Sequence, residues 1–139
     1  MIKNYKLFSF YSLIVLLLIL LDQLVKWWII ANHPSLVLAN TGIIFGFIQN
    51  PIISYILLVI GVVFLVWMVR RQPSANSYQL TVFILIIAGA ISNLIDRVFR
   101  GYVIDYIHFF NLNVFNLADV FIITGIVLYA YQILKIKES

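Results

Sequence analysis

Residues 80–99 read LTVFILIIAGAISNLIDRVF, and this segment decides the fold. About 20 apolar residues are enough to cross the hydrocarbon core of a bilayer as a helix. Asn93, Asp96 and Arg97 interrupt the run at helical spacing, so they share one face. A carboxylate near a bilayer costs free energy and is usually retained for a function, facing a protein interior or a wet cavity. The segment therefore predicts a membrane helix with a polar face at one end.

The composition of the whole chain agrees with this prediction. The 139 residues are 64% hydrophobic and only 10% charged, with a mean hydropathy of +1.08. Soluble domains average about 25% charged residues. We expect a single integral-membrane domain over residues 1–139. The chain has no cysteine, which excludes thiol nucleophiles, disulfides and thiolate metal sites.

Four segments have the length and hydrophobicity of a spanning helix, at about 7–30, 52–69, 80–99 and 118–134. In lipid the backbone must satisfy its own hydrogen bonds, so helices are the default. The sequence predicts an all-α membrane protein with four transmembrane helices. Residues 31–51, between spans one and two, contain turn residues and two stretches with strand character, at 36–38 and 43–48. We expect a small extracytoplasmic strand-like or loop region there.

The basic residues predict the topology. Apart from Lys26 within span one, and Arg97 and Arg100 as exceptions at the outer end of span three, they gather before span one, after span two and after span four, at Lys3, Lys6, Arg70, Arg71, Lys135 and Lys137. With four spans these clusters fall on one side, which the positive-inside rule makes cytoplasmic. Connections 31–51 and 100–116 then lie outside. The net charge of +4 is therefore a topology signal rather than a nucleic-acid signal. No small-residue cleavage site follows the first apolar run, so we expect an uncleaved span.

Nearly all other polar residues fall toward the outer ends of the spans. Two pairs among them have a structural explanation. Asp22 and Lys26 are spaced i, i+4 and can form a salt bridge within span one. Asp96 can pair in the same way with Arg100. A structural ion pair is the preferred interpretation of both Asp22 and Asp96.

Asp105 and Asp119 are less easily explained by structure alone. Asn116 suits the N-cap of span four, which places Asp119 at N3; alone, this aspartate could simply meet the helix dipole. Asp105 lies between apolar neighbours, which a solvated loop aspartate would not need. Two carboxyl groups that lie close together can activate a water molecule, one as general base and the other as general acid. Asn93 and Arg97 could donate hydrogen bonds to a bound peptide backbone.

Rival chemistries have weaker support. Ser92 is near the polar face, but the only histidines are His33 and His108, and neither is an evident partner. A metal site built from Asp105, His108 and Asp119 stays open as an alternative, although the chain has no HExxH-type ligand pair.

These residues fall in five ordered motifs: DQLVK at 22–26, NTGIIFG at 40–46, NLIDR at 93–97, GYVIDY at 101–106 and FNLAD at 115–119. Together they closely resemble the lipoprotein signal peptidases, or type II signal peptidases, of bacteria. The resemblance covers essentially the whole chain. It departs from the family pattern at AGAIS, residues 88–92, where glycines are usual, and at Tyr106, where Phe is common. The first outer connection also looks short.

The resemblance implies a membrane-embedded aspartyl peptidase with Asp105 and Asp119 as the catalytic pair. It implies that further residues line or support the site: Asn40, Gly42, Asn93, Arg97, Asn116, Asp22, Lys26 and Asp96. The implied substrates are prolipoproteins that carry diacylglycerol on a cysteine, and the signal peptide is cut just before that cysteine. No metal or organic cofactor is implied.

The expected location is the bacterial cytoplasmic membrane, with both termini inside and the site facing the extracytoplasmic side. We expect a monomer whose partners are prolipoproteins and membrane lipids, without nucleic acid. The alternatives from another class are a non-catalytic membrane protein that binds signal peptides or lipoproteins, and a small proton-coupled transporter.

Overall fold

The computed structural model describes residues 2–42, 77–110 and 113–137, together with residues 52, 56, 59–61, 63 and 67. The long helices are α1 (Ile2–Asn32), α3 (Ser77–Arg100) and α4 (Leu117–Lys137). A 3₁₀ turn, η1 (Pro34–Leu36), follows α1. Four short strands complete the described part: β1 (Leu38–Asn40), β2 (Val103–Asp105), β3 (Ile107–Phe109) and β4 (Asn113–Phe115).

Among the described residues, three helices are long and apolar enough to cross a membrane, over Ser9–Asn32, Tyr78–Arg100 and Leu117–Lys135. They coincide with three of the four predicted spans. The remaining predicted span is span two, at 52–69. Its seven described residues are helical, and its other residues lie outside the described part of the chain. A mostly helical membrane protein is thus confirmed, whereas the count of four spans stays a prediction.

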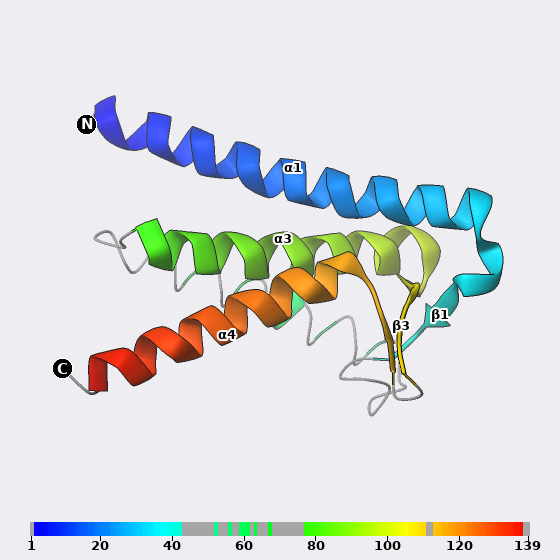
Figure 1. The fold of residues 1–139 in the computed structure, drawn as a ribbon. Helices are drawn as coiled ribbons and strands as arrows, with labels where there is room; N and C mark the ends of the chain where they lie inside the picture. Colours follow the sequence, from blue (N-terminus) through cyan, green and yellow to red (C-terminus); the bar gives the residue numbers. More distant parts are fainter. Residues whose placement is uncertain are drawn as a thin grey trace.

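The three long helices run side by side, with α3 between α1 and α4 (Figure 1). The two chain termini lie at one end of this layer, and the strands lie at the other end. The polar residues of α1 and α3 belong to the strand end, because Asp22 and Asp96 both fall in the last third of their helices.

Small residues let α3 and α4 approach closely. A Cβ added at Gly89 would lie 2.3 Å from the backbone oxygen of Ala118, and one added at Gly125 would lie 2.5 Å from the Ile86 side chain. In lipid, where apolar side chains gain little by leaving the solvent, such close backbone packing is a main source of helix association. Alanine and serine in the 88–92 segment therefore do not prevent tight packing.

The strands come from the segment after α1 and from the segment between α3 and α4. β1 pairs antiparallel with β2, with Leu38 opposite Asp105 and Asn40 opposite Val103. β3 pairs antiparallel with β4 as a hairpin, with Ile107 opposite Phe115. The strand-like region was predicted between spans one and two alone, and its described strand instead takes its partner from the segment after α3. The stretch 43–48 lies outside the described residues.

Gly101 turns the chain out of α3 and into β2. Its φ of +81° is in the left-handed region that favours glycine, and its N–H donates to the Arg97 carbonyl at 3.0 Å. The two residues after the turn, Val103 and Ile104, are buried. The turn thus leads into β2, which packs against α3 and ends at Asp105.

Substitution of Gly89 tests the contact between α3 and α4. We expect Gly89→Ala to lower the free energy of unfolding by roughly 1–3 kcal/mol, because its Cβ meets backbone that cannot easily yield. Thermal unfolding of the purified protein in detergent measures this. Gly61→Ala is the matched control, since nothing lies within 4 Å of its added Cβ. Equal melting temperatures for the two variants would contradict the close contact.

Candidate active site

Asp105 is fully buried at the end of β2, and neutral amides hold both of its oxygens. The Asn116 side-chain amide donates to Oδ1 at 2.6 Å, and the Asn40 amide donates to Oδ2 at 2.8 Å. Asn40 reaches Asp105 diagonally across the β1–β2 pair, because its direct partner is Val103. The carboxylate therefore lies where α3, α4 and both connections meet.

Asp119 is half-buried in the first turn of α4 and forms a reciprocal cap with Asn116. The Asp119 N–H donates to Asn116 Oδ1 at 2.9 Å, and the Asn116 N–H donates to Asp119 Oδ2 at 3.2 Å. This confirms the predicted N-cap and the predicted N3 position. The other oxygen, Oδ1, accepts a hydrogen bond from the Asn93 amide at 2.8 Å.

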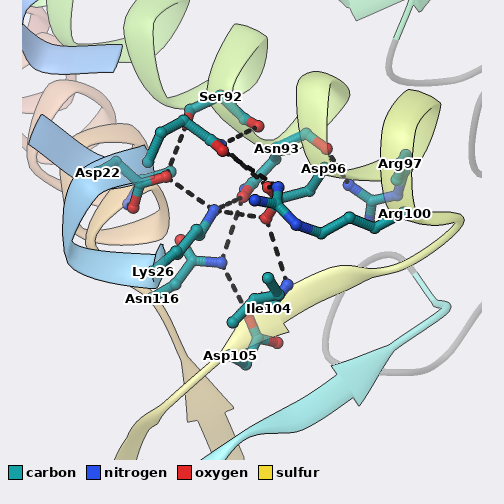
Figure 2. A network of polar contacts seen from close by, with 12 residues as sticks. Asp22, Lys26, Ser92, Asn93, Asp96, Arg97, Arg100, Ile104, Asp105 and Asn116 are labelled. Atoms are coloured by element: carbon teal, nitrogen blue, oxygen red, sulfur yellow. Dashed lines mark hydrogen bonds and ion pairs between the residues drawn. The ribbon is translucent and has the colours of Figure 1, made fainter. Parts of the chain in front are cut away.

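Asn116 connects the two carboxylates. Its side-chain Nδ2 donates to Asp105 and also to Asn93 Oδ1 at 3.2 Å, while its backbone N–H donates to Asp119. Asn93 in turn donates to Asp119. Two asparagines thus fix the positions of Asp105 and Asp119 relative to each other, and Figure 2 shows the Asp105 side of this arrangement.

Burial is the main cause that raises the pKa of Asp105 from 3.8 to about 6. The hydrogen bonds from Asn40 and Asn116 oppose this shift, and the negative charge of Asp119 adds to it. The carboxyl group therefore exchanges its proton near neutral pH, where a general acid or base works best.

A buried ion cluster lies beside the pair (Figure 2). Lys26 Nζ is fully buried and lies 2.7 Å from both Asp22 Oδ2 and Asp96 Oδ2. Asp96 Oδ1 also pairs with Arg100 at 2.5 Å. The predicted pairs Asp22–Lys26 and Asp96–Arg100 are confirmed. The link between Lys26 and Asp96 was not predicted, because helical spacing says nothing about how α1 meets α3.

The cluster holds the chain next to each carboxylate of the pair. Asp96 Oδ2 accepts the Ile104 N–H at 3.2 Å, one residue before Asp105. Asp22 Oδ1 accepts the Ala118 N–H at 2.9 Å, one residue before Asp119. The supporting role expected for these aspartates therefore has a defined geometry in the backbone.

Arg97 contacts the first outer connection. Its Nη2 donates to the Gly42 carbonyl at 2.8 Å, and the Gly42 N–H donates to Asn40 Oδ1 at 2.9 Å. Because Oδ1 is engaged in this way, the NH₂ group of Asn40 faces Asp105. Arg97 thus reaches the backbone of the segment after β1, and its contact with a substrate backbone stays a prediction.

Two polar neighbours of the cluster make contacts that the sequence analysis did not predict, although it considered Ser92 as a nucleophile. Gln23 donates to Asp96 Oδ1 at 2.9 Å and accepts from Arg100 at 3.1 Å, and Ser92 donates to Asp22 at 2.6 Å. The partners of both residues lie on another helix, which spacing along the chain does not reveal. The one sequence signal was that Gln23 is adjacent to Asp22 and Ser92 is adjacent to Asn93.

The metal site considered from the sequence finds no support in the described part of the chain. No group of three or more His, Cys, Asp or Glu side chains there could hold a metal ion. His108, the third ligand of that alternative, has its Nε2 atom 3.0 Å from the Leu36 carbonyl oxygen.

Fold and site together define a class of protein: a helical membrane protein with two carboxyl groups held by amide side chains at one end of its helices. The sequence pattern described as "Signal peptidase (SPase) II" matches residues 14–135. The chain belongs to the signal peptidase II family. The predicted activity, an aspartic signal peptidase acting on lipoprotein precursors, is confirmed with it.

Individual relatives agree with this assignment. The chain is 38% identical to the lipoprotein signal peptidase of Bartonella henselae, over 88% of this chain and 86% of that protein. It is 34% identical to the lipoprotein signal peptidase of Rickettsia bellii, over 99% of this chain and 81% of that protein. A solved structure described as a bacterial membrane enzyme aligns with a TM-score of 0.78 at 26% identity, covering 91% of this chain and 88% of that one.

The raised pKa of Asp105 makes stability depend on pH. The folded state binds this proton more tightly than the unfolded chain does. The stability that protonated Asp105 contributes is therefore largest below about pH 4 and is lost as the pH rises through about 6. The full shift corresponds to roughly 3 kcal/mol at most. We expect the melting temperature to fall between pH 4.5 and 7, and to fall less steeply for Asp105→Asn. Parallel slopes would show that another group titrates.

Proposed function

We propose that Asp105 and Asp119 are the catalytic pair of this peptidase, and that it cuts diacylglyceryl-modified prolipoproteins just before the lipid-modified cysteine. The observation that carries the proposal is the shared contact with Asn116, which donates one hydrogen bond to each carboxylate. In the described part of the chain, the hydrogen bonds that these two carboxylates accept come from neutral amide groups rather than from cations.

The pair is suited to activating water. One carboxylate, ionised, takes a proton from a water molecule while the other, protonated, donates a hydrogen bond to the scissile carbonyl oxygen. The water oxygen bonds to the carbonyl carbon and gives a tetrahedral intermediate. When the C–N bond breaks, a carboxyl group returns the proton to the leaving amine. Two close carboxyl groups share one proton readily, because both cannot ionise easily.

The surrounding amides keep this chemistry available. Asn40, Asn93 and Asn116 supply hydrogen bonds without adding a positive charge, so they orient the carboxylates without forcing both to ionise. Nearby, Lys26 pairs with Asp22 and Asp96 and also donates to Asn93 Oδ1 at 3.3 Å. The mechanism needs no metal ion or organic cofactor.

The membrane position of the site follows from the charge pattern of the sequence. In the proposed topology four helices cross the cytoplasmic membrane, both termini are cytoplasmic, and the strands lie on the extracytoplasmic side. The gathering of both termini at the end opposite the strands supports it (Figure 1). A substrate tethered by diacylglycerol would arrive laterally, with its lipid holding the cleavage site at headgroup depth. Apolar burial of the acyl chains would contribute to binding.

Replacing either carboxylate tests the proposed pair. Asp105→Asn and Asp119→Asn should each lower kcat by at least about 1,000-fold, because an amide keeps the shape but cannot exchange the proton. The double variant should be no slower than the slower single one. Cleavage of a diacylglyceryl-modified prolipoprotein by purified protein in detergent measures this.

Glu138→Gln is the matched control, because it makes the same change from carboxylate to amide at the single glutamate of the chain. This variant should retain full turnover. Near-normal turnover by either aspartate variant would rule out the pair. Activity that is lost with a chelator and restored by zinc or manganese would replace it with metal chemistry.

Single cysteines test the topology, since the natural chain has none. Cysteines placed at Ser35, Asn76 and Asn111 are treated in intact cells with a membrane-impermeant thiol reagent. We expect labelling at positions 35 and 111 but not at 76, because the positive-inside rule places residues 70–78 in the cytoplasm. The opposite pattern would put Asp105 and Asp119 on the cytoplasmic side and contradict the proposed substrate.

A further inference from the structure

Ser92 is a fully buried residue of α3 whose hydroxyl has a defined direction. Gln23 Nε2 donates to Ser92 Oγ at 3.0 Å and to the Ser92 carbonyl at 3.2 Å. Oγ lies 2.6 Å from Asp22 Oδ2, which as a carboxylate oxygen can only accept. The single hydroxyl proton of Ser92 is therefore committed to Asp22.

This hydrogen bond helps to select which oxygen of Asp22 faces α4. Oδ2 accepts from Ser92 and pairs with Lys26 at 2.7 Å. Oδ1 is thereby presented to the Ala118 N–H at 2.9 Å, in the first turn of α4. The first turn of a helix carries unpaired N–H groups and favours a negative charge, so the carboxylate fixes this turn from outside the helix.

The next residue along α4 is Asp119. The Ser92 hydroxyl thus reaches the half-buried carboxylate of the pair in three steps, through Asp22, the Ala118 N–H and one peptide unit. The Ser92 hydroxyl contacts Asp22 (Figure 2) and accepts a hydrogen bond from Gln23. We propose that Ser92 is a positioning residue for Asp119, acting through the Asp22 carboxylate. This inference rests on the proposed function of Asp119.

Removing the hydroxyl should leave the fold in place. In Ser92→Ala, Asp22 keeps Lys26 and the Ala118 N–H, and Gln23 keeps the residue-92 carbonyl and Asp96 Oδ1. What is lost is one of the two donors that hold Oδ2. A small displacement of a reacting group lowers the rate of the chemical step more than it lowers substrate affinity. The effect should therefore appear in kcat rather than in KM.

The experiment measures kcat and KM of Ser92→Ala on a diacylglyceryl-modified prolipoprotein. We expect kcat to fall about tenfold and KM to stay within about twofold. Ser12→Ala, which removes an exposed hydroxyl from α1, is the matched control and should match the natural protein. Ser92→Gly removes the same hydroxyl without adding volume, and it takes the place of Ser92→Ala if that variant yields no folded protein.

A double-mutant cycle with Asp22→Asn separates positioning from a general effect on packing. If Ser92 acts through the Asp22 carboxylate, adding Ser92→Ala to Asp22→Asn should change kcat by less than about twofold. A normal kcat for Ser92→Ala, or an undiminished tenfold loss in the Asp22→Asn background, would overturn the inference. Activity in Asp119→Asn would instead overturn the proposed function, so the two failures are distinguishable.

Discussion

The burial of Lys26 between Asp22 and Asp96 is the interaction on which the rest of the structure depends. All three side chains have no exposed area, so their charges are removed from water. That transfer is expensive, and it is repaid only when the geometry is good and the remaining lone pairs are satisfied. Here the remaining lone pairs of the carboxylates accept N–H groups from Ile104 and Ala118. The charges of α1 and α3 therefore fix the backbone of β2 and α4.

This arrangement divides the acidic residues into two groups with different environments. Asp22 and Asp96 have cationic partners and serve as fixed negative charges. Asp105 and Asp119 have amide partners, and burial holds the pKa of Asp105 at about 6. Groups whose environments differ in this way can be assigned different roles, and the raised pKa of Asp105 brings its carboxyl group into the range suited to proton exchange.

Local features of the site could be predicted from the sequence, and long-range ones could not. The Asp22–Lys26 pair and the cap between Asn116 and Asp119 follow from spacing along one helix, and both were predicted. The contacts of Lys26 with Asp96 and of Asp22 with Ala118 join segments far apart in the chain. They depend on how closely the helices approach and on their rotation about their axes, which helical periodicity does not determine.

The same limit applies to the outer strands. Strand character near residue 38 was visible in the composition, but its pairing with β2 depends on the turn at Gly101, which lies beyond a whole spanning helix. The long apolar helices themselves were the most predictable part of the fold, because length and hydropathy decide them.

The cluster formed by Asp22, Lys26, Asp96 and Arg100 has two positive and two negative charges, and its formal sum is zero. Only Arg100 reaches the surface, with 29% of its side chain exposed. Mobile ions screen charges they can approach, and they screen buried pairs much less. The strength of this cluster should thus be nearly independent of ionic strength. The geometry it imposes on the outer end of the helices is insulated from changes in the salinity of the surrounding medium.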